Sequence, residues 1–225
     1  MLYKSLGIAT WPWQWSLQEL APDVLHKGIY ATVTSAAYDT LAGPTPRAGR
    51  ALVRAGSYDV DGEILRVVDF DVHAGVSSDE GDGDQWPQLR RRILDADILV
   101  LGTPIWMGHP SSVCQRVLER CDAFLAETDD LGRMVSYDRV AGVAVVGNED
   151  GAHHVFAELA QALSDVGFTI PAEGSTYWVG EAMQPIDFND KHPTPEKTAQ
   201  SAATLARNLA HLAHALRAAG YPAGT

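Results

Sequence analysis

Two apolar runs in this chain have the length of β-strands and are too short to be typical helices. Residues 97–102 read DILVLG, and residues 140–146 read VAGVAVV. Neither run alternates apolar with polar residues, which is typical of strands buried on both faces of a parallel sheet. Further strand-like stretches lie at residues 29–34, 63–69 and 175–179. The sequence therefore predicts five strands.

Helix-like stretches alternate with these strands. They are expected at residues 47–56, 86–95, 111–127 and 152–167, and in a last helix from Pro195 with Thr194 as its N-cap. Parallel strands need a crossover connection, which is usually a helix. The pattern predicts an α/β fold in which a doubly wound, parallel, five-stranded sheet carries helices on both faces.

Ligands of such sheets bind outside the carboxyl ends of the strands. That rule selects residues 103–110 as the first loop of interest. Within it Pro104 sets the exit direction, Trp106 offers a flat apolar face, and Gly108 allows close backbone approach. The loop suits a flat aromatic ligand. The alternative is that Trp106 and Met107 cap the core beneath an ordinary loop.

The same rule selects residues 147–154. Asn148 and Gly151 favour a tight turn, and backbone N–H groups at the start of the next helix could stabilise negative charge on a ligand. The alternative is a turn and helix cap without a ligand. The adjacent His153 and His154 point about 100° apart on a helix, so at most one is expected to face the site. They lack a third partner at a recognisable spacing, so no metal is expected.

Other chemistry finds little support. Residues 79–84 are acidic, but Pro87 interrupts the spacing of an EF-hand, so a solvated loop is expected. Tyr177 and Trp178 end a strand and could line a substrate pocket or pack in the core.

Cys114 and Cys121 would lie about 10 Å apart on one helix, too far for a disulfide, and are expected to be buried thiols. Phosphate-loop, dinucleotide-fingerprint and serine-hydrolase motifs do not occur.

The composition limits the partners. With 17 Lys and Arg against 29 Asp and Glu, the net charge is −12, which disfavours nucleic acid and anionic membranes. No apolar run has the length of a membrane span, and the N-terminus does not resemble a signal peptide, so a cytoplasmic protein is expected.

Residues 1–27, with Trp11, Trp13 and Trp15, are expected to form an extension before a domain over residues 28–225. The tryptophans indicate a surface that needs cover, as in a homo-oligomer.

A family resemblance extends these inferences. Residues 96–125, ADILVLGTPIWMGHPSSVCQRVLERCDAFL, together with VAGVAVVGNEDGAHH, resemble the flavodoxin-like NADPH-dependent FMN reductases. Their motif combines an apolar strand, a Gly-[Ser/Thr]-Pro turn with an aromatic residue and a glycine, and a helix ending near Asp-Arg. Here the helix ends LERCDAFL, so the order Asp-Arg is not kept. The resemblance covers roughly residues 60–180 and implies a flavodoxin-like fold.

The resemblance also implies a site for FMN. Thr103 would belong to it, Pro104 to Gly108 would lie along the isoalloxazine, and Asn148 to Gly151 would flank its pyrimidine end. The implied cofactor-binding residues are therefore Thr103, Pro104, Ile105, Trp106, Met107, Gly108, Asn148, Glu149, Asp150 and Gly151. His153 is the implied catalytic residue, at the flavin rim.

The phosphate of FMN is implied near Thr34 and Ser35. In the family this loop is rich in Ser, Thr and Asn and leads into a helix N-terminus, which binds anions through backbone N–H groups. Here Pro44 and Pro46 interrupt the following stretch. Backbone amides and hydroxyls would hold the phosphate, so the negative net charge does not exclude FMN.

The resemblance implies an oxidoreductase that passes hydride from NAD(P)H through FMN to a flavin, a quinone or a similar small acceptor. In this scheme the cofactor performs the chemistry, and the protein contributes stacking and fixed dipoles. Two alternatives stay open. One is an FMN-binding electron carrier without its own NAD(P)H site, whose acidic surface would suit a basic partner. The other is a chain that has lost flavin and serves in interaction alone.

Overall fold

Three parallel strands form the centre of the fold in a computed structural model, which describes residues 52–55, 60–181, 184–191 and 193–224. The strands are β3 (Ile98–Trp106), β5 (Val140–Gly147) and β6 (Ser175–Val179). The short β4 (His109–Pro110) extends this sheet, and β1 (Leu52–Ala55) and β2 (Val60–Glu63) form a separate one. The helices are α3 (Trp86–Asp95), α4 (Ser112–Cys121), α5 (Ala152–Asp165) and α6 (Glu196–Ala218), with single 3-10 turns η2 (Val67–Asp69), η3 (Asp122–Ala126) and η4 (Phe188–Asp190).

The order of strands in the main sheet is β4-β3-β5-β6. β5 is central and pairs in parallel with β3 through Leu101↔Val143 and with β6 through Val145↔Tyr177. β4 is antiparallel to β3, with Trp106 opposite His109. β1 pairs antiparallel with β2, and among the described residues neither strand joins the main sheet.

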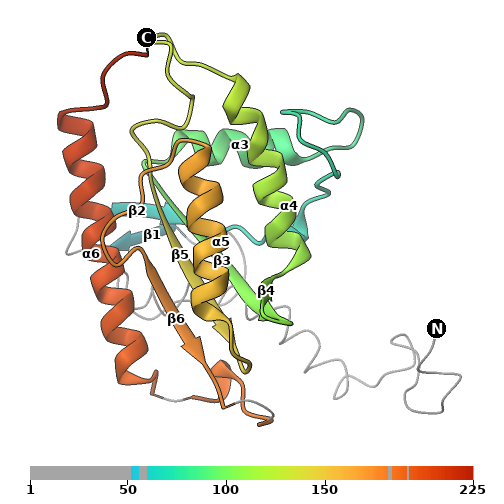
Figure 1. The fold of residues 1–225 in the computed structure, drawn as a ribbon, viewed down its shortest axis with the longest axis vertical. Coiled ribbons are helices and arrows are strands. Elements are labelled where there is room, and N and C mark those ends of the chain that lie inside the picture. Colours follow the sequence, from blue (N-terminus) through green and yellow to red (C-terminus); the bar gives the residue numbers. More distant parts are fainter. Residues whose placement is uncertain (1–51, 56–59, 182–183, 192, 225) are drawn as a thin grey trace, which may run out of the picture.

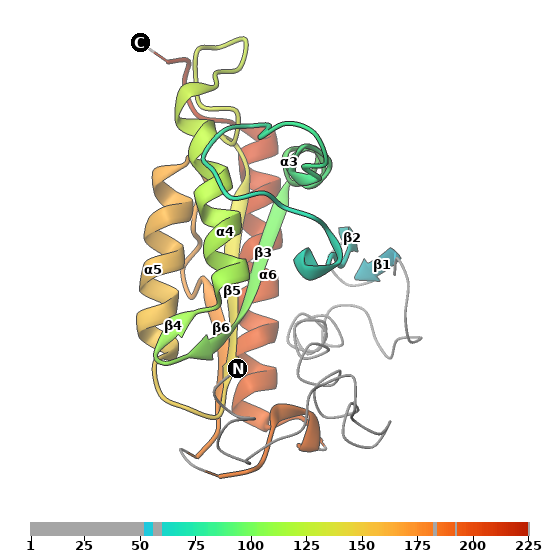
Figure 2. The same cartoon turned by 90° about the vertical axis from the view of Figure 1, so that its right-hand side faces the viewer.

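Helices cover both faces of the sheet. Seen edge-on, α4 and α5 lie on one face and α6 on the other (Figure 2). Side chains alternate along β5 accordingly: Val143 and Val145 pack in the same cluster as residues of α4 and α5, while Val140 packs with Leu205 and Leu209 of α6. This arrangement confirms the doubly wound α/β architecture that the apolar runs predict. Figure 1 shows the same layers face-on.

Most predicted elements are confirmed, with adjusted ends. Ser111 caps α4, its Oγ accepting the Cys114 N–H at 3.2 Å. Thr194 is not the cap of the last helix, because α6 begins at Glu196 and Pro195 precedes it. β3 runs further than expected, to Trp106, because its end pairs with β4 in a two-residue hairpin. Met107 and Gly108 both have positive φ, 53° and 80°, as a tight hairpin turn requires.

Two expectations near the start of the described chain are wrong. Residues 63–69 do not form a strand of the parallel sheet; β2 ends at Glu63, and Val67–Asp69 form the turn η2. Leu65, Val67 and Phe70 nevertheless pack against the core, so their apolar character reflects burial without strand pairing. A helix at residues 47–56 is contradicted by β1. The strand expected at residues 29–34 and the extension over residues 1–27 lie outside the described residues.

Residues 79–83 of the acidic loop are exposed, as predicted, but Asp84 is not. The Asp84 side chain is fully buried and forms an ion pair with the buried Arg120, Oδ2 to Nη2, at 2.6 Å. Burial alone would raise the pKa of Asp84, but backbone N–H groups of Glu80, Trp86 and His73, together with Arg120, lower the pKa to about 2. Asp84 therefore organises the loop around its carboxylate and is not a solvated residue.

The two cysteines are buried and free, as predicted. Cys114 is 3% exposed and Cys121 is 1% exposed. Burial raises the pKa of both thiols to about 12, so neither is a thiolate at neutral pH. These residues belong to the core between α4 and the sheet.

Among the described helices, none combines the length and the apolar composition that crossing a bilayer requires.

Candidate functional site

The two loops selected from the sequence meet at the carboxyl edge of the sheet. The Met107 backbone N–H donates a hydrogen bond to Glu149 Oε1 at 2.7 Å, which joins the β3–β4 turn to the β5–α5 loop. Close backbone contact supports the join: a Cβ added to Gly151, whose φ is +128°, would lie 3.0 Å from the Cα of Gly108. The structure therefore brings Met107, Gly108, Glu149 and Gly151 together.

Large apolar side chains are exposed at this edge. Trp106 is 50% exposed and Met107 is 89% exposed. A Cβ added to Gly108 would meet nothing within 4 Å, so the space beside the turn is open. An exposed indole next to open space can hold a flat apolar ligand. The alternative that Trp106 and Met107 cap the core is not supported, because neither is buried.

Two members of the predicted set lie in the interior. Thr103 is buried, and its Oγ1 accepts the Ser111 N–H at 3.1 Å. Ile105 is also buried and packs beneath Gly147, where an added Cβ would lie 2.9 Å from the Ile105 Cβ. Pro104 pairs with Val146 across the sheet and is partly exposed. Thr103 and Ile105 therefore support the loop from below.

The β5–α5 loop is held on its other side as well. Asn148 is partly buried, and its Nδ2 donates to Asp187 Oδ1 at 3.5 Å. Asp187 in turn caps η4. Asp150 is exposed and accepts the N–H of Gly151 at 2.7 Å. Glu149, Asp150 and Asp187 place several carboxylates at this edge, which fits a neutral ring system better than a phosphate.

The two adjacent histidines diverge, as predicted. His153 lies against Tyr177 of β6, with Nε2 3.1 Å from the tyrosine hydroxyl and the rings edge to face. His154 lies instead against His109 of β4, with ring centroids 5.0 Å apart. His154 is thereby linked to the hairpin that carries Trp106, and His153 to the neighbouring strand.

Sequence reasoning missed three of these residues as parts of a site. His109 lies within the selected loop at residues 103–110 but was given no role, Glu158 lies one helical turn after His154, and Asp187 belongs to an irregular stretch. The spacing of His154 and Glu158 by four residues was the available signal, because such residues share a helix face. Thr34 and Ser35, the predicted phosphate residues, lie outside the described residues.

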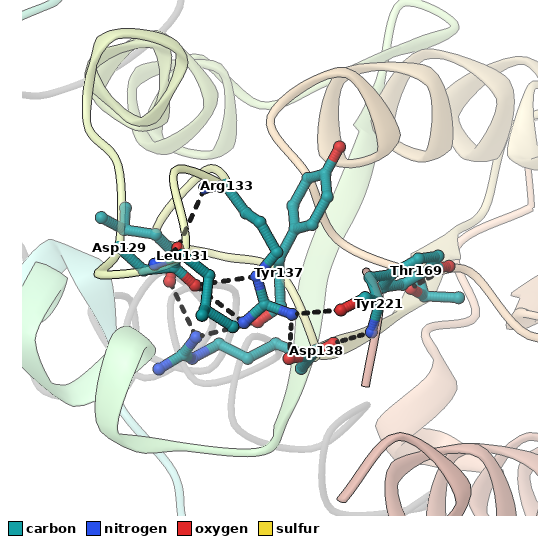
Figure 3. A network of polar contacts seen from close by, with 9 residues as sticks. Asp129, Leu131, Arg133, Tyr137, Asp138, Thr169 and Tyr221 are labelled. Carbon is teal, nitrogen blue, oxygen red and sulfur yellow. Dashed lines mark hydrogen bonds and ion pairs between the residues drawn. The ribbon is translucent and has the colours of Figure 1, made fainter. Parts of the chain in front are cut away.

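A second polar region lies at the opposite, amino-terminal edge of the sheet, around a cavity of about 600 Å³. Its charges are already paired (Figure 3). Arg133 donates to Asp129 Oδ2 at 2.7 Å and to the Tyr221 carbonyl at 2.8 Å, and it pairs with Asp138 at 2.7 Å. Hydrogen bonds with Asp129, and then Asp138, raise the pKa of Arg133 above its ordinary value. This cluster fastens the C-terminal segment and lies at the wrong end of the strands for a ligand of a doubly wound sheet.

Comparison with known proteins identifies the family. The model of the NADPH-dependent FMN reductase family matches residues 41–184. The chain belongs to this family. FMN is the cofactor that the family implies. The match begins after Thr34 and Ser35.

Two curated relatives are similar in sequence. The 8-demethyl-8-aminoriboflavin-5'-phosphate synthase of Streptomyces davaonensis is 31% identical over 175 residues, which cover 72% of this chain and 67% of that protein. A divalent metal cation transporter, MntH, of Mycobacterium bovis is 38% identical over 168 residues. Those residues cover 72% of this chain but 25% of the transporter, so the chain spans about a quarter of that relative.

A solved structure is similar as well. It is RosB with the bound intermediate 8-demethyl-8-formylriboflavin-5'-phosphate, which superposes with a TM-score of 0.68 at 27% identity. The similarity covers 84% of this chain and 75% of RosB. The flavodoxin-like fold expected from the sequence is confirmed.

The described residues fit a flavin ring system. The exposed Trp106 and Met107 offer apolar surface, and the glycines at positions 108 and 151 let the two loop backbones approach closely. These features lie at the carboxyl edge of the strands, where ligands of this fold class bind. The fit concerns the isoalloxazine end of FMN.

Proposed function

We propose that the protein is an FMN-dependent NAD(P)H oxidoreductase that passes hydride from NAD(P)H through bound FMN to a flavin, a quinone or a similar small acceptor. The observation that carries the proposal is the join between the β3–β4 turn and the β5–α5 loop, which leaves Trp106 and Met107 exposed beside open space in a chain of the FMN reductase family.

Within this proposal each of the two loops binds a different part of the flavin. Pro104, Trp106, Met107 and Gly108 bind the isoalloxazine along its length, with Thr103 and Ile105 holding the turn from below. Asn148 to Gly151 flank the pyrimidine end, and the N-terminal N–H groups of α5 favour negative charge there. When bound, FMN supplies the reversible transfer of hydride. Trp106 orients the ring by stacking and excludes water from one side of it.

Two further roles belong to the proposal. His153 is the residue that moves a proton at the rim of the site, through the Nε2 atom that lies 3.1 Å from the Tyr177 hydroxyl. Thr34 and Ser35 bind the phosphate through hydroxyl and backbone groups. We also propose a cytoplasmic homo-oligomer, since exposed apolar residues at a site rim are often covered by a second subunit.

The test measures the turnover of NADPH or NADH by the FMN-loaded protein. The purified chain, loaded with FMN, is mixed with NADPH or NADH and with a quinone or free FMN as acceptor. The proposal expects consumption of the nicotinamide that depends on FMN and on the acceptor. No consumption by a chain that retains FMN would favour the electron carrier instead.

A second candidate function follows from the likeness to RosB, whose structure holds a flavin derivative as an intermediate. In this candidate the flavin phosphate at the same loops is the substrate that is modified, instead of a cofactor that is regenerated. Mass spectrometry of the flavin after incubation separates the two. An unchanged flavin mass favours the oxidoreductase, and a changed mass favours flavin modification.

A further inference from the structure

Three metal-ligating side chains converge beside the candidate flavin site. They are His109 of β4 and His154 and Glu158 of α5, and their nearest ligand atoms all lie within 4.8 Å of one another. Glu158 Oε1 lies 2.9 Å from His109 Nδ1 and 2.6 Å from His154 Nε2. An ionised carboxylate has no proton to donate, so in this arrangement both imidazoles donate to the same oxygen.

The backbone holds these side chains in place from two directions. His154 and Glu158 are four residues apart on α5 and therefore share one helix face. His109 pairs with Trp106 across the hairpin, and the hairpin itself is held against the start of α5 by the contact of Gly108 with Gly151. The three ligands thus come from two elements that are already packed together, and their convergence does not depend on a flexible segment.

The ligand set fits one class of metal ion. Imidazole nitrogen with one carboxylate oxygen suits Zn²⁺ and neighbouring late transition ions, whereas Mg²⁺ and Ca²⁺ prefer oxygen ligands alone. Tetrahedral Zn²⁺ with bonds of about 2.0–2.1 Å places its ligand atoms about 3.3 Å apart. The two separations from Glu158 Oε1, 2.6 and 2.9 Å, are shorter than this, and the third, between the two histidine ligand atoms, is no more than 4.8 Å, so side-chain rotations bring all three to the distances that an ion requires.

The site also has an open side. The side chains of His109 and His154 are 63% and 56% exposed, and that of Glu158 is 32% exposed. Three protein ligands with solvent on the remaining side leave a fourth position for water or another small ligand. A closed structural zinc site would have a fourth protein ligand and would be buried.

We propose that His109, His154 and Glu158 form a binding site for a divalent transition ion of the zinc class at the rim of the candidate flavin site. The bound ion fastens β4 to α5 and so fixes the turn that presents Trp106 and Met107. Sequence spacing did not predict it because His109 lies 49 residues from Glu158 along the chain. The site is separate from the residues that contact the flavin in the proposed function.

The experiment is isothermal titration calorimetry of the full chain with ZnCl₂, after treatment with a chelator that is then removed. We expect one saturable site per chain, with no comparable binding of MgCl₂. His109→Gln, His154→Gln and Glu158→Gln should each weaken zinc affinity by about tenfold or more. Removing a residue that only hydrogen-bonds to a metal ligand already lowers metal affinity by about 10–100-fold. His153→Gln, on the same helical turn but directed at Tyr177, is the matched control and should leave the zinc affinity unchanged.

X-ray absorption at the zinc edge provides a second readout, and we expect it to show two imidazole ligands. The result does not depend on FMN, because it is measured on the same protein with and without added flavin. Absence of saturable zinc binding, or affinity unchanged by all three substitutions, would show that the cluster is only a hydrogen-bonded ion pair and would overturn the proposal.

Discussion

Met107 and Glu149 are joined by a backbone-to-carboxylate hydrogen bond of 2.7 Å that spans 42 residues of the chain. Met107 has a φ of 53°, in the left-handed region, at the tip of the β3–β4 hairpin. Glu149 belongs to the loop that follows the central strand. The bond therefore ties together the two loops that occupy the carboxyl edge of the sheet, and it orients the turn that carries Trp106.

Glu149→Ala removes the acceptor of this hydrogen bond. We expect FMN to bind about five- to tenfold more weakly. A hydrogen bond with one charged partner contributes about 1.5 kcal/mol or more, and part of this free energy holds the two loops in the arrangement that binds FMN. Quenching of flavin fluorescence measures the affinity. Asp165→Ala is the control, since it removes an exposed carboxylate at the far end of α5, and equal losses in both variants would contradict the role of Glu149.

Trp106→Ala removes the exposed indole from the turn. A stacked aromatic pair contributes about 1 kcal/mol beyond its area burial, so we expect FMN affinity to fall by about fivefold or more, while Trp106→Phe keeps most of it. The same fluorescence titration applies. Leu131→Ala, which removes an exposed apolar residue at the opposite end of the sheet, is the matched control. Unchanged affinity in Trp106→Ala would exclude the stacking role.

Asp84→Asn leaves the Arg120 guanidinium buried without its counter-charge. Removal of one partner of a buried ion pair costs about 3–5 kcal/mol, and we expect a loss of that size in the free energy of unfolding by urea. The control is Asp82→Asn in the same loop, where an exposed position predicts a change within about 0.5 kcal/mol. Similar stability of the two variants would refute the buried pair as a determinant of the fold.

The same carboxylate predicts a pH dependence. The folded-state pKa of Asp84 is about 2, below its ordinary value of 3.8, so the ionised form stabilises the fold above about pH 4. This contribution, about 2 kcal/mol, is lost as the pH falls from about 4 to 2. The difference in unfolding free energy between the natural chain and Asp84→Asn should therefore narrow over that range, and a constant difference would contradict the lowered pKa.

Cys114 and Cys121 should be inert towards thiol reagents in the folded protein. Both are buried, and a pKa of about 12 leaves almost no thiolate at pH 8. A colorimetric thiol titration should detect neither cysteine under native conditions and both in urea. Rapid native reaction of either thiol would show that the segment around α4 opens.

The parts of the fold that follow from the sequence are those with strong apolar patterns. The run at residues 140–146 is buried on both faces and could be identified as β5 without a structure. The run at residues 97–102 could be identified as β3, although only Leu101 in it is buried and its other residues are partly exposed or exposed. Leu65 and Val67 have the same apolar character, but they are only partly buried against the core and belong to no strand. An apolar stretch indicates burial, and it indicates strand pairing where no charge interrupts it, whereas Arg66 interrupts the stretch at residues 63–69.

The candidate site was predictable in part for a similar reason. Trp106 and Gly151 follow predicted strands, so the topology placed their loops at one edge. Long-range polar pairs had no local signal: Asp84 meets Arg120 across 36 residues, and His109 meets Glu158 across 49. Only His154 and Glu158, four residues apart on one helix, could have been paired from sequence.

Anaerobic reduction of the bound flavin tests the central claim most directly. The purified chain is loaded with FMN, freed of excess flavin and oxygen, and mixed with NADPH or with NADH while the visible flavin band is recorded. An NAD(P)H oxidoreductase predicts that this band bleaches within a single turnover and returns when a quinone is added. A flavin that stays oxidised with both nicotinamides, or a chain that does not retain FMN, would contradict the account.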